Sequence, residues 1–217
     1  PGYNLHFRTM DWEMDFLRDL TINVEFYKKG RLLFKGVTWA GYVGIVTGMN
    51  ESYSIAINYR RSNGTIMGNM MRTLRMKWPI GYLTRHIYEQ DLWFSDAREM
   101  LQFSPLIAPC YITLCASTAK IGNSVVLVRD NKETVNIKHI GFEDRPYLVQ
   151  TNCDDNEDIN NIMWSHERVR KVEQLACNYT HMDTDEIIDL VLNKYYTYPI
   201  INAHTIYVCV MVPNEFR

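Results

Sequence analysis

The sequence lacks the features that define several classes of protein. Its 217 residues carry a net charge of −2 and a pI near 6.3, without the basic excess of a domain that binds nucleic acid through electrostatics. No apolar run is long enough for a membrane-spanning helix, and the longest candidate, residues 105–116, is better interpreted as a buried strand. Repeats, linkers and low-complexity segments are also missing. With 47% hydrophobic residues, the chain is predicted to form one globular domain over residues 1–217.

Metal-binding patterns are equally scarce. The six histidines show no HxxxH or HxH pair, and the acidic run 154–158 lacks the glycine and the distal glutamate of a calcium loop. We therefore expect no metal site and no cofactor. The cysteines show no CxxC spacing, and their odd number leaves at least one thiol free or paired with another chain. They are Cys110, Cys115, Cys153, Cys177 and Cys209.

Three Asn-x-Ser/Thr sequons begin at Asn50, Asn63 and Asn178, each at a plausible turn or helix end. Such triplets also arise by chance. As acceptors for N-linked glycans, these three favour a secretory route for the protein.

The first third of the chain follows the alternating pattern of β-strands. Residues 3–9, 31–39, 42–48 and 53–59 are predicted strands. In the first, apolar and polar side chains take opposite faces, so His6 and Arg8 share one face. In the last, large residues from Tyr53 to Tyr59 occupy one face and small residues the other, as in a strand that is covered on both sides.

The rest of the chain mixes helical and extended patterns. Apolar residues recur every three or four positions over 66–78, and further helices are expected to open at Pro79 and near Ser95. Strands are predicted at 111–116, 124–129, 133–139, 147–151 and 204–211, and helices at 163–176 and 184–193. This order of elements predicts an α+β layered domain.

Four short motifs give the sequence a resemblance to a known family. They are Arg8-Thr9-Met10-Asp11, Ala40-Gly41-Tyr42-Val43-Gly44 with Thr47-Gly48, Val149-Gln150-Thr151-Asn152, and Glu167-Arg168. In order and approximate spacing they resemble the β-subunit of acid ceramidase and of N-acylethanolamine acid amidase, over nearly the whole chain. These proteins are N-terminal-nucleophile amide hydrolases, similar to choloylglycine hydrolase.

The resemblance implies an αββα sandwich, formed when a proenzyme cleaves itself and frees a cysteine at the start of the β-subunit. In such a site the free α-amine accepts the thiol proton, the thiolate attacks the amide carbonyl, and water hydrolyses the acyl-enzyme. The resemblance also implies roles for four residues. Asn152 would donate to the oxyanion, and Arg8 and Arg168 would supply positive charge near the thiolate. Asp11 would hold the α-amine or orient Arg8.

The sequence departs from the family in two places. The nucleophilic cysteine belongs one strand and one turn upstream of Arg8, before Pro1, so we expect the first strand of the sandwich to be missing and the segment alone to be inactive. Tyr59 stands where the family carries an active-site glutamate, and its hydroxyl replaces a carboxylate. Cys153 has no α-amine, which favours a packed thiol. The family also pairs a cysteine near the position of Cys177 with the α-subunit, which implies a disulfide there.

The residues themselves leave other interpretations open. Arg168 falls on the apolar face of its helix, where it needs a buried partner or must extend to solvent. Arg8 and Asp11 can form a simple ion pair at a strand end. Because residues three apart face opposite ways in a straight strand, the two need a bend or bulge near Met10 to meet. Asn152 can be a turn former.

We therefore predict a lysosomal amide hydrolase that cleaves ceramide into a fatty acid and a sphingoid base. Its expected partner is an α-subunit from the same precursor. The alternatives are an N-acylethanolamine amidase and a catalytically silent lipid-binding or interaction protein, which Tyr59 and the absent cysteine suggest.

Independently of the family, segment 66–78, with Arg72, Arg75 and Lys77, has the pattern of a basic amphipathic helix. Such a helix can rest on an anionic membrane or simply pack on the sheet.

Overall fold

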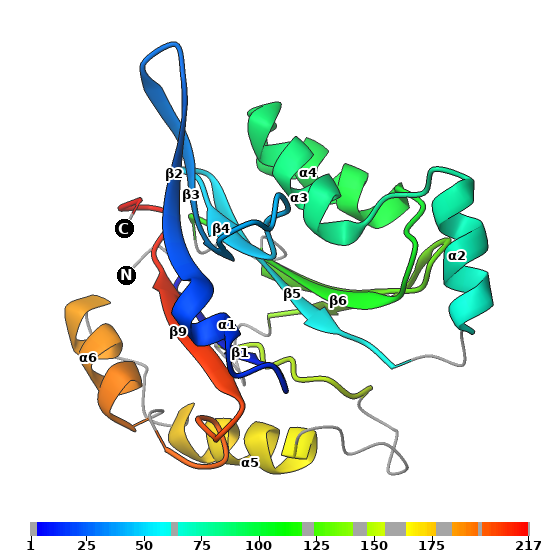
Figure 1. Ribbon diagram of the computed structural model, residues 1–217. Coiled ribbons are helices and arrows are strands. Elements are labelled where there is room, and N and C mark those ends of the chain that lie inside the picture. Colours follow the sequence, from blue (N-terminus) through cyan, green and yellow to red (C-terminus); the bar gives the residue numbers. More distant parts are fainter. Residues whose placement is uncertain are drawn as a thin grey trace.

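The chain folds into four layers in the order helix, sheet, sheet, helix (Figure 1). The computed structural model describes residues 4–61, 65–118, 124–140, 147–154, 164–176, 184–194 and 197–216. A seven-stranded antiparallel sheet forms one inner layer and a two-stranded antiparallel sheet forms the other. The architecture confirms the predicted α+β sandwich.

The large sheet follows the order of the sequence, and each strand pairs with the next. Its strands are β2 (Thr21–Lys28), β3 (Arg31–Trp39), β4 (Thr47–Met49), β5 (Tyr53–Tyr59), β6 (Cys110–Ala116), β7 (Ser124–Arg129) and β8 (Thr134–His139). The small sheet instead joins the two ends of the chain, since β1 (His6–Asp11) pairs with β9 (Thr205–Met211). Within the described ranges, β1 is hydrogen-bonded to a strand along one edge only.

The helices that follow the short α1 fall into two groups along the chain. The helices are α1 (Leu17–Leu20), α2 (Ile66–Leu74), α3 (Ile80–Glu89), α4 (Phe94–Phe103), α5 (Ser165–Ala176) and α6 (Thr184–Lys194). Helices α2 to α4 lie on the side of the large sheet, and α5 and α6 lie on the side of β9 (Figure 1). No helix in the described part of the chain combines the length and the apolar character needed to cross a bilayer.

The main core lies between the large sheet and helices α3 and α4. Tyr53, Ile55 and Ile57 project from one face of β5 into this core, where α3 contributes Leu83 and Ile87 at a spacing of one helical turn. Aromatic rings continue the core, with Phe34 and Tyr88 stacked at a centroid distance of 4.9 Å. This packing leaves the opposite face of β5 free to meet the small sheet.

The two sheets meet across a second, more polar layer. Met10, Trp39, Ile206 and Tyr207 form its apolar part, and the Tyr207 hydroxyl lies 2.8 Å from the Thr47 hydroxyl. The outer face of the small sheet carries Phe7 and Val210, which pack with Ile200 against Val172 and Leu175 of α5. The inner face of β1 therefore carries the residues of opposite parity, His6, Arg8 and Met10, all of them buried.

Several sequence predictions are confirmed. Strands 31–39 and 53–59 have the predicted bounds, and residues 53–57 are buried on both faces of the sheet. The helix expected at Pro79 begins there, with Pro79 as an extended N-cap residue. The bulge expected near Met10 is also present, because the β1–β9 register shifts between Met10 and Asp11.

One of the predicted strands is wrong and another is shortened, and one strand of the structure is not among those predicted. Within 42–48 only Thr47 and Gly48 belong to a strand, β4, because the Ile45 amide donates to the carbonyl of Gly81 in the first turn of α3 and not to a neighbouring strand. Residues 147–151 form no strand; the Gln150 and Thr151 carbonyls accept hydrogen bonds from a side chain instead of a strand ladder. Strand β2 was not predicted, although its sequence alternates.

Candidate functional site

Arg8 lies on β1 and points between the two sheets. Its residue is only 6% exposed, and its guanidinium donates to the Asn58 side-chain oxygen and to the Met10 sulfur at 3.2 Å. Asn58, on β5, donates in turn to the Gln150 and Thr151 carbonyls at 3.3 and 3.4 Å. The small-residue face of β5 thus links β1 to the segment that carries the Gln-Thr-Asn motif.

Asp11 follows the bulge in β1 and turns toward α5. Its Oδ1 accepts a hydrogen bond from the Thr205 hydroxyl at 2.7 Å, and its Oδ2 accepts one from the Asn202 amide at 3.3 Å. The Arg168 Nη1 atom lies 3.0 Å from the same Oδ2. Both side chains of this ion pair are buried, with 3% of Asp11 and 7% of Arg168 exposed. Asp11 therefore contacts Arg168, and no contact between Asp11 and Arg8 is found.

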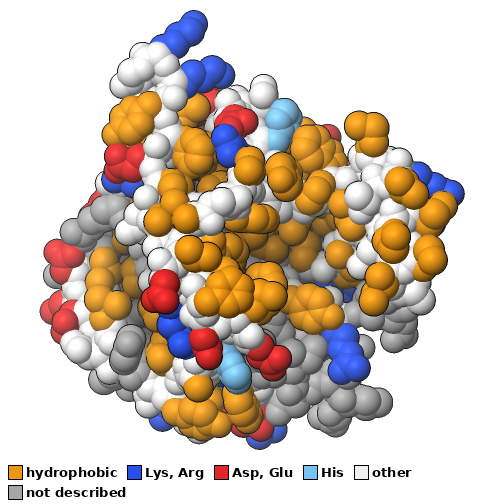
Figure 2. All heavy atoms as spheres, viewed as in Figure 1, with side chains coloured by type: hydrophobic (Ala, Val, Ile, Leu, Met, Phe, Trp, Pro, Cys, Tyr) orange, Lys and Arg blue, Asp and Glu red, His pale blue; other side chains and the backbone are white. Residues whose placement is uncertain are grey.

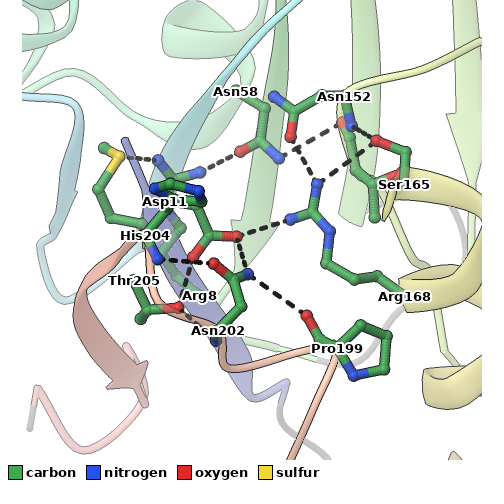
Figure 3. A network of polar contacts seen from close by, with 12 residues as sticks. Arg8, Asp11, Asn58, Asn152, Ser165, Arg168, Pro199, Asn202, His204 and Thr205 are labelled. Atoms are coloured by element: carbon green, nitrogen blue, oxygen red, sulfur yellow. Dashed lines mark hydrogen bonds and ion pairs between the residues drawn. The ribbon is translucent and has the colours of Figure 1, made fainter. Parts of the chain in front are cut away.

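Arg168 joins the acidic and amide parts of the site (Figure 3). Besides the ion pair, its Nη2 donates to the Asn152 Oδ1 at 2.9 Å and to the Ser165 hydroxyl at 3.4 Å. Burial lowers the pKa of the Arg168 guanidinium, while the Asp11 carboxylate opposes that shift. Because an arginine side chain titrates only at strongly basic pH, it keeps its charge in this buried position.

Asn152 is held at both ends of its side chain. Its Oδ1 accepts from Arg168, its Nδ2 donates to the Tyr59 carbonyl at 2.9 Å, and its main-chain amide donates to Ser165 at 3.2 Å. A carboxamide nitrogen carries two N–H groups. The second has no acceptor among the described residues, so it remains a donor with a fixed direction.

The four predicted residues are thus connected by hydrogen bonds, and they do not lie apart on the surface. Arg168 contacts both Asp11 and Asn152, and Arg8 reaches the Asn152 segment through Asn58 (Figure 3). The network brings together two guanidinium groups, a carboxylate and a carboxamide. Such a set can stabilise negative charge and orient a neighbouring group, but it contains no thiol and no amine.

Tyr59 lies next to this network without sending its side chain into it. Its residue is 62% exposed, and it shares the face of β5 that carries Tyr53, Ile55 and Ile57. Asn58, which contacts Arg8, is on the other face. Only the Tyr59 carbonyl takes part in the site, through the hydrogen bond from Asn152.

Other predicted positions have plainer surroundings. Cys153 is 7% exposed, and its sulfur lies 3.7 Å from the Thr151 hydroxyl and 3.8 Å from the His166 Nδ1, as expected for a packed thiol.

The structure argues against the predicted glycan at Asn50. That residue is 5% exposed and its side-chain oxygen accepts from two main-chain amides of the following turn.

Three further predictions fall outside the described residues, namely the glycans at Asn63 and Asn178 and the disulfide at Cys177. Among the residues that are described, no cluster of three or more His, Cys, Asp or Glu side chains could hold a metal ion.

Sequence reasoning missed four residues of the network. These are Asn58, Ser165, Asn202 and Thr205. Asn58 was recognisable as a polar residue on the small-residue face of β5, the face that meets Arg8. Ser165 is the first residue of α5 and Thr205 the first residue of β9, but the patterns that predict these elements do not show which side chains reach the site, and Asn202 belongs to no helix or strand. The contacts of Asn202 and Thr205 with Asp11 span 191 and 194 positions of sequence.

The sequence has recognisable relatives, although no family model matches it. It is 36% identical over 212 residues to the uncharacterized protein R632 of Acanthamoeba polyphaga mimivirus, covering 94% of this chain and 62% of that protein. It is 28% identical over 233 residues to the acid ceramidase of Homo sapiens, covering 95% of this chain and 55% of the enzyme. The chain therefore spans little more than half the length of these relatives.

The fold has a relative among solved structures as well. The N-acylethanolamine-hydrolyzing acid amidase ortholog of Caenorhabditis elegans superimposes with a TM-score of 0.79 at 25% identity. The match covers 98% of this chain and 89% of that one. Sequence and fold thus lead to the same group of proteins.

Proposed function

Because the chain belongs to the family of acid ceramidase and N-acylethanolamine-hydrolyzing acid amidase, we propose that the protein is a lipid amide hydrolase that cleaves ceramide to a fatty acid and a sphingoid base. One observation carries the proposal. Arg168 contacts both Asp11 and Asn152, and the family resemblance assigns all three residues to the same active site. These residues are separated by up to 157 positions in the sequence.

The proposed reaction uses a cysteine outside the printed sequence, on a strand before β1. Its α-amine accepts the thiol proton, and the thiolate attacks the amide carbonyl of the lipid. The amine of the sphingoid base leaves with a proton, and water then hydrolyses the acyl-enzyme to release the fatty acid. The edge of β1 that has no strand partner in the described ranges offers such a strand a place to pair.

Each network residue has a distinct part in this proposal. The Arg8 and Arg168 guanidinium groups favour the thiolate over the thiol. Asn152 donates its second N–H to the oxyanion, and its other contacts fix the direction of that donor before the substrate arrives. Asp11 orients Arg168 and keeps acceptor capacity for the α-amine, since a carboxylate offers about four lone-pair sites.

The test is an assay of the full-length protein with ceramide and with an N-acylethanolamine. We expect turnover of ceramide, and we expect Asn152→Ala to lower kcat by about 10²- to 10³-fold, the usual cost of losing an oxyanion donor. Asn136→Ala, at an exposed position of β8, is the matched control. A wild-type protein that hydrolyses neither lipid, or an Asn152→Ala variant with wild-type kcat, would contradict the proposal.

Two other functions are distinguished by the same assay. Preference for the N-acylethanolamine would favour the activity named for the Caenorhabditis elegans relative, which is 25% identical over 222 residues. Lipid binding without turnover would favour a catalytically silent protein, an alternative that the tyrosine at position 59 supports.

We further propose that the protein is located in the lysosome and that it is joined through Cys177 to an α-subunit from the same precursor. A mass spectrum of the non-reduced protein would show that bridge.

Membrane contact through α2 is part of the proposed function. No residue of this helix is buried, and Ile66 and Leu74 are 82% and 76% exposed. Figure 2 shows hydrophobic side chains and Lys or Arg atoms together at the right-hand edge, where Figure 1 places α2. Apolar side chains beside cationic ones suit an anionic lipid surface.

The basic residues predicted to lie on one helix differ in their suitability for this contact, because α2 ends at Leu74 and only Arg72 belongs to it, whereas Arg75 and Lys77 follow it. Arg72 donates to the Ile107 carbonyl at 2.6 Å and thus ties the helix to the body of the protein. Arg75 and Lys77 are therefore the better residues to reverse. We expect Arg75→Glu with Lys77→Glu to weaken binding to phosphatidylserine vesicles, whereas Arg98→Glu on α4 serves as a control. Unchanged vesicle binding would remove α2 from the proposal.

A further inference from the structure

A second polar cluster lies beside the candidate site. The Arg60 guanidinium binds the Asp154 carboxylate through two hydrogen bonds, of 3.2 Å from Nε and 2.7 Å from Nη2. The Tyr111 hydroxyl donates to the same carboxylate at 2.7 Å, and the guanidinium lies 5.9 Å from the centre of the Tyr111 ring. The ion pair is largely shielded, with 16% of the Arg60 side chain and 28% of the Asp154 side chain exposed.

The cluster holds the main chain of residues 150–154, the segment that carries Asn152, through contacts with Asp154. Arg60 directly follows Tyr59, whose carbonyl accepts the Asn152 hydrogen bond, and Asp154 lies two residues beyond Asn152. On the other side of Asn152, the Asn58 amide holds the Gln150 and Thr151 carbonyls. Residues 150–154 belong to no helix or strand. Asn58 near the end of β5 and Arg60 just after it therefore hold this segment on both sides of Asn152, in addition to the contacts that Asn152 makes with α5.

We propose that Arg60, Tyr111 and Asp154 are positioning residues, which fix the direction of the Asn152 carboxamide through the main chain. This inference rests on the proposed function, since it names the groups that hold the oxyanion donor of that reaction. A bidentate arginine–carboxylate pair has a defined geometry, and a hydroxyl on a neighbouring strand adds a third fixed point. Tyr111 faces Asn58 across the β5–β6 ladder, so both anchors of the segment belong to one rigid sheet.

The charge state of the cluster agrees with this role. Burial alone would raise the pKa of Asp154, but the hydrogen bonds from Arg60 and Tyr111 outweigh it and hold the pKa below its ordinary value. The Asp154 carboxylate is therefore ionised in mildly acidic solution, and its contact with Arg60 persists there.

The test compares kcat and KM in the full-length protein. Asp154→Asn and Tyr111→Phe should each lower kcat about 10-fold, because small misplacements of a catalytic group are costly, while KM stays within about twofold. Arg60→Lys should retain more activity than Arg60→Met. Glu89→Gln, which breaks the Arg85–Glu89 ion pair on α3 at the same 2.7 Å distance, should leave kcat unchanged.

The decisive comparison uses an Asn152→Ala background. If Asp154 acts through Asn152, then Asp154→Asn should have no further effect on kcat in that background. An equal fall in both backgrounds would overturn the proposal and leave Asp154 a merely structural residue.

A measurement without turnover separates this inference from the proposed function. In nitrogen-15-labelled protein, the side-chain amide signal of Asn152, assigned by its loss in Asn152→Ala, should shift or broaden in Asp154→Asn and Tyr111→Phe. It should stay in place in Glu89→Gln. An unmoved signal would refute the positioning role even if the lipid assay succeeds, and a moved signal would support it even if the wild-type protein proves inactive.

Discussion

The ion pair between Asp11 and Arg168 allows the sharpest test of the site. We expect Asp11→Asn to lower the free energy of unfolding by about 3–5 kcal/mol, the usual cost of removing one partner from a buried pair. The pair is 3.0 Å long and its side chains are only 3% and 7% exposed, so the variant leaves a guanidinium charge in a nearly dry position. Asparagine keeps the size of the side chain and an acceptor for Thr205. The loss therefore measures charge rather than volume.

Urea denaturation of the purified protein is the assay, with Asp91→Asn as the matched control. The Arg31–Asp91 pair is exposed, with 62% and 43% of its side chains accessible, so its loss should cost less than about 1 kcal/mol. Asparagine also tolerates the positive φ of 55° at position 91. At urea slopes of about 2–3 kcal/mol per molar, the two variants should differ in midpoint by roughly 1 M.

A double variant checks the cause of the loss. Asp11→Asn combined with Arg168→Met removes both charges, and it should be more stable than Asp11→Asn alone because no uncompensated ion remains. If Asp11→Asn and Asp91→Asn cost the same, or if the double variant is the least stable of all, the assignment of a desolvated ion pair is refuted.

Three other predictions concern the body of the fold. Burial, with help from the Arg8 charge, lowers the pKa of His6 to about 3. Between pH 6.5 and 3 the unfolded chain therefore binds a proton that the folded chain does not, so stability falls as the pH falls. Relative to the wild type, the free energy of unfolding of His6→Gln should rise by about 2–3 kcal/mol between pH 7 and pH 4.5, as measured by urea titration at both pH values. The same difference between the two proteins at both pH values would contradict the buried neutral imidazole. Gly48→Ala should cost about 1–3 kcal/mol in the same assay, because its new methyl would lie 2.9 Å from a main-chain oxygen of β3; wild-type stability would show that the strands can move apart. Cys110 is 3% exposed, and burial raises the pKa of its thiol to about 12. Iodoacetamide at pH 8 should therefore label Cys110 only after the protein unfolds. Rapid labelling of the native protein would contradict the burial of this residue.

The sequence by itself determined many of the regular elements and the resemblance to the family. Strands 31–39 and 53–59 were predictable because their alternation repeats every two residues, and the start of α3 because proline fits the beginning of a helix. The bulge beside Met10 followed from parity together with the resemblance, which assigns Arg8 and Asp11 to one site. The bounds of the strands and the start of the helix are carried by local spacing.

Only the tertiary structure decided which groups meet. The contacts of Asp11 with Arg168 and Thr205 cross 157 and 194 positions, and a side-chain hydrogen bond leaves no periodic trace in the sequence. The same limit explains why the exposure of Tyr59 and the burial of Asn50 could not be foreseen. Residue type sets what a side chain can donate or accept, but the packing of the two sheets sets the partner it reaches.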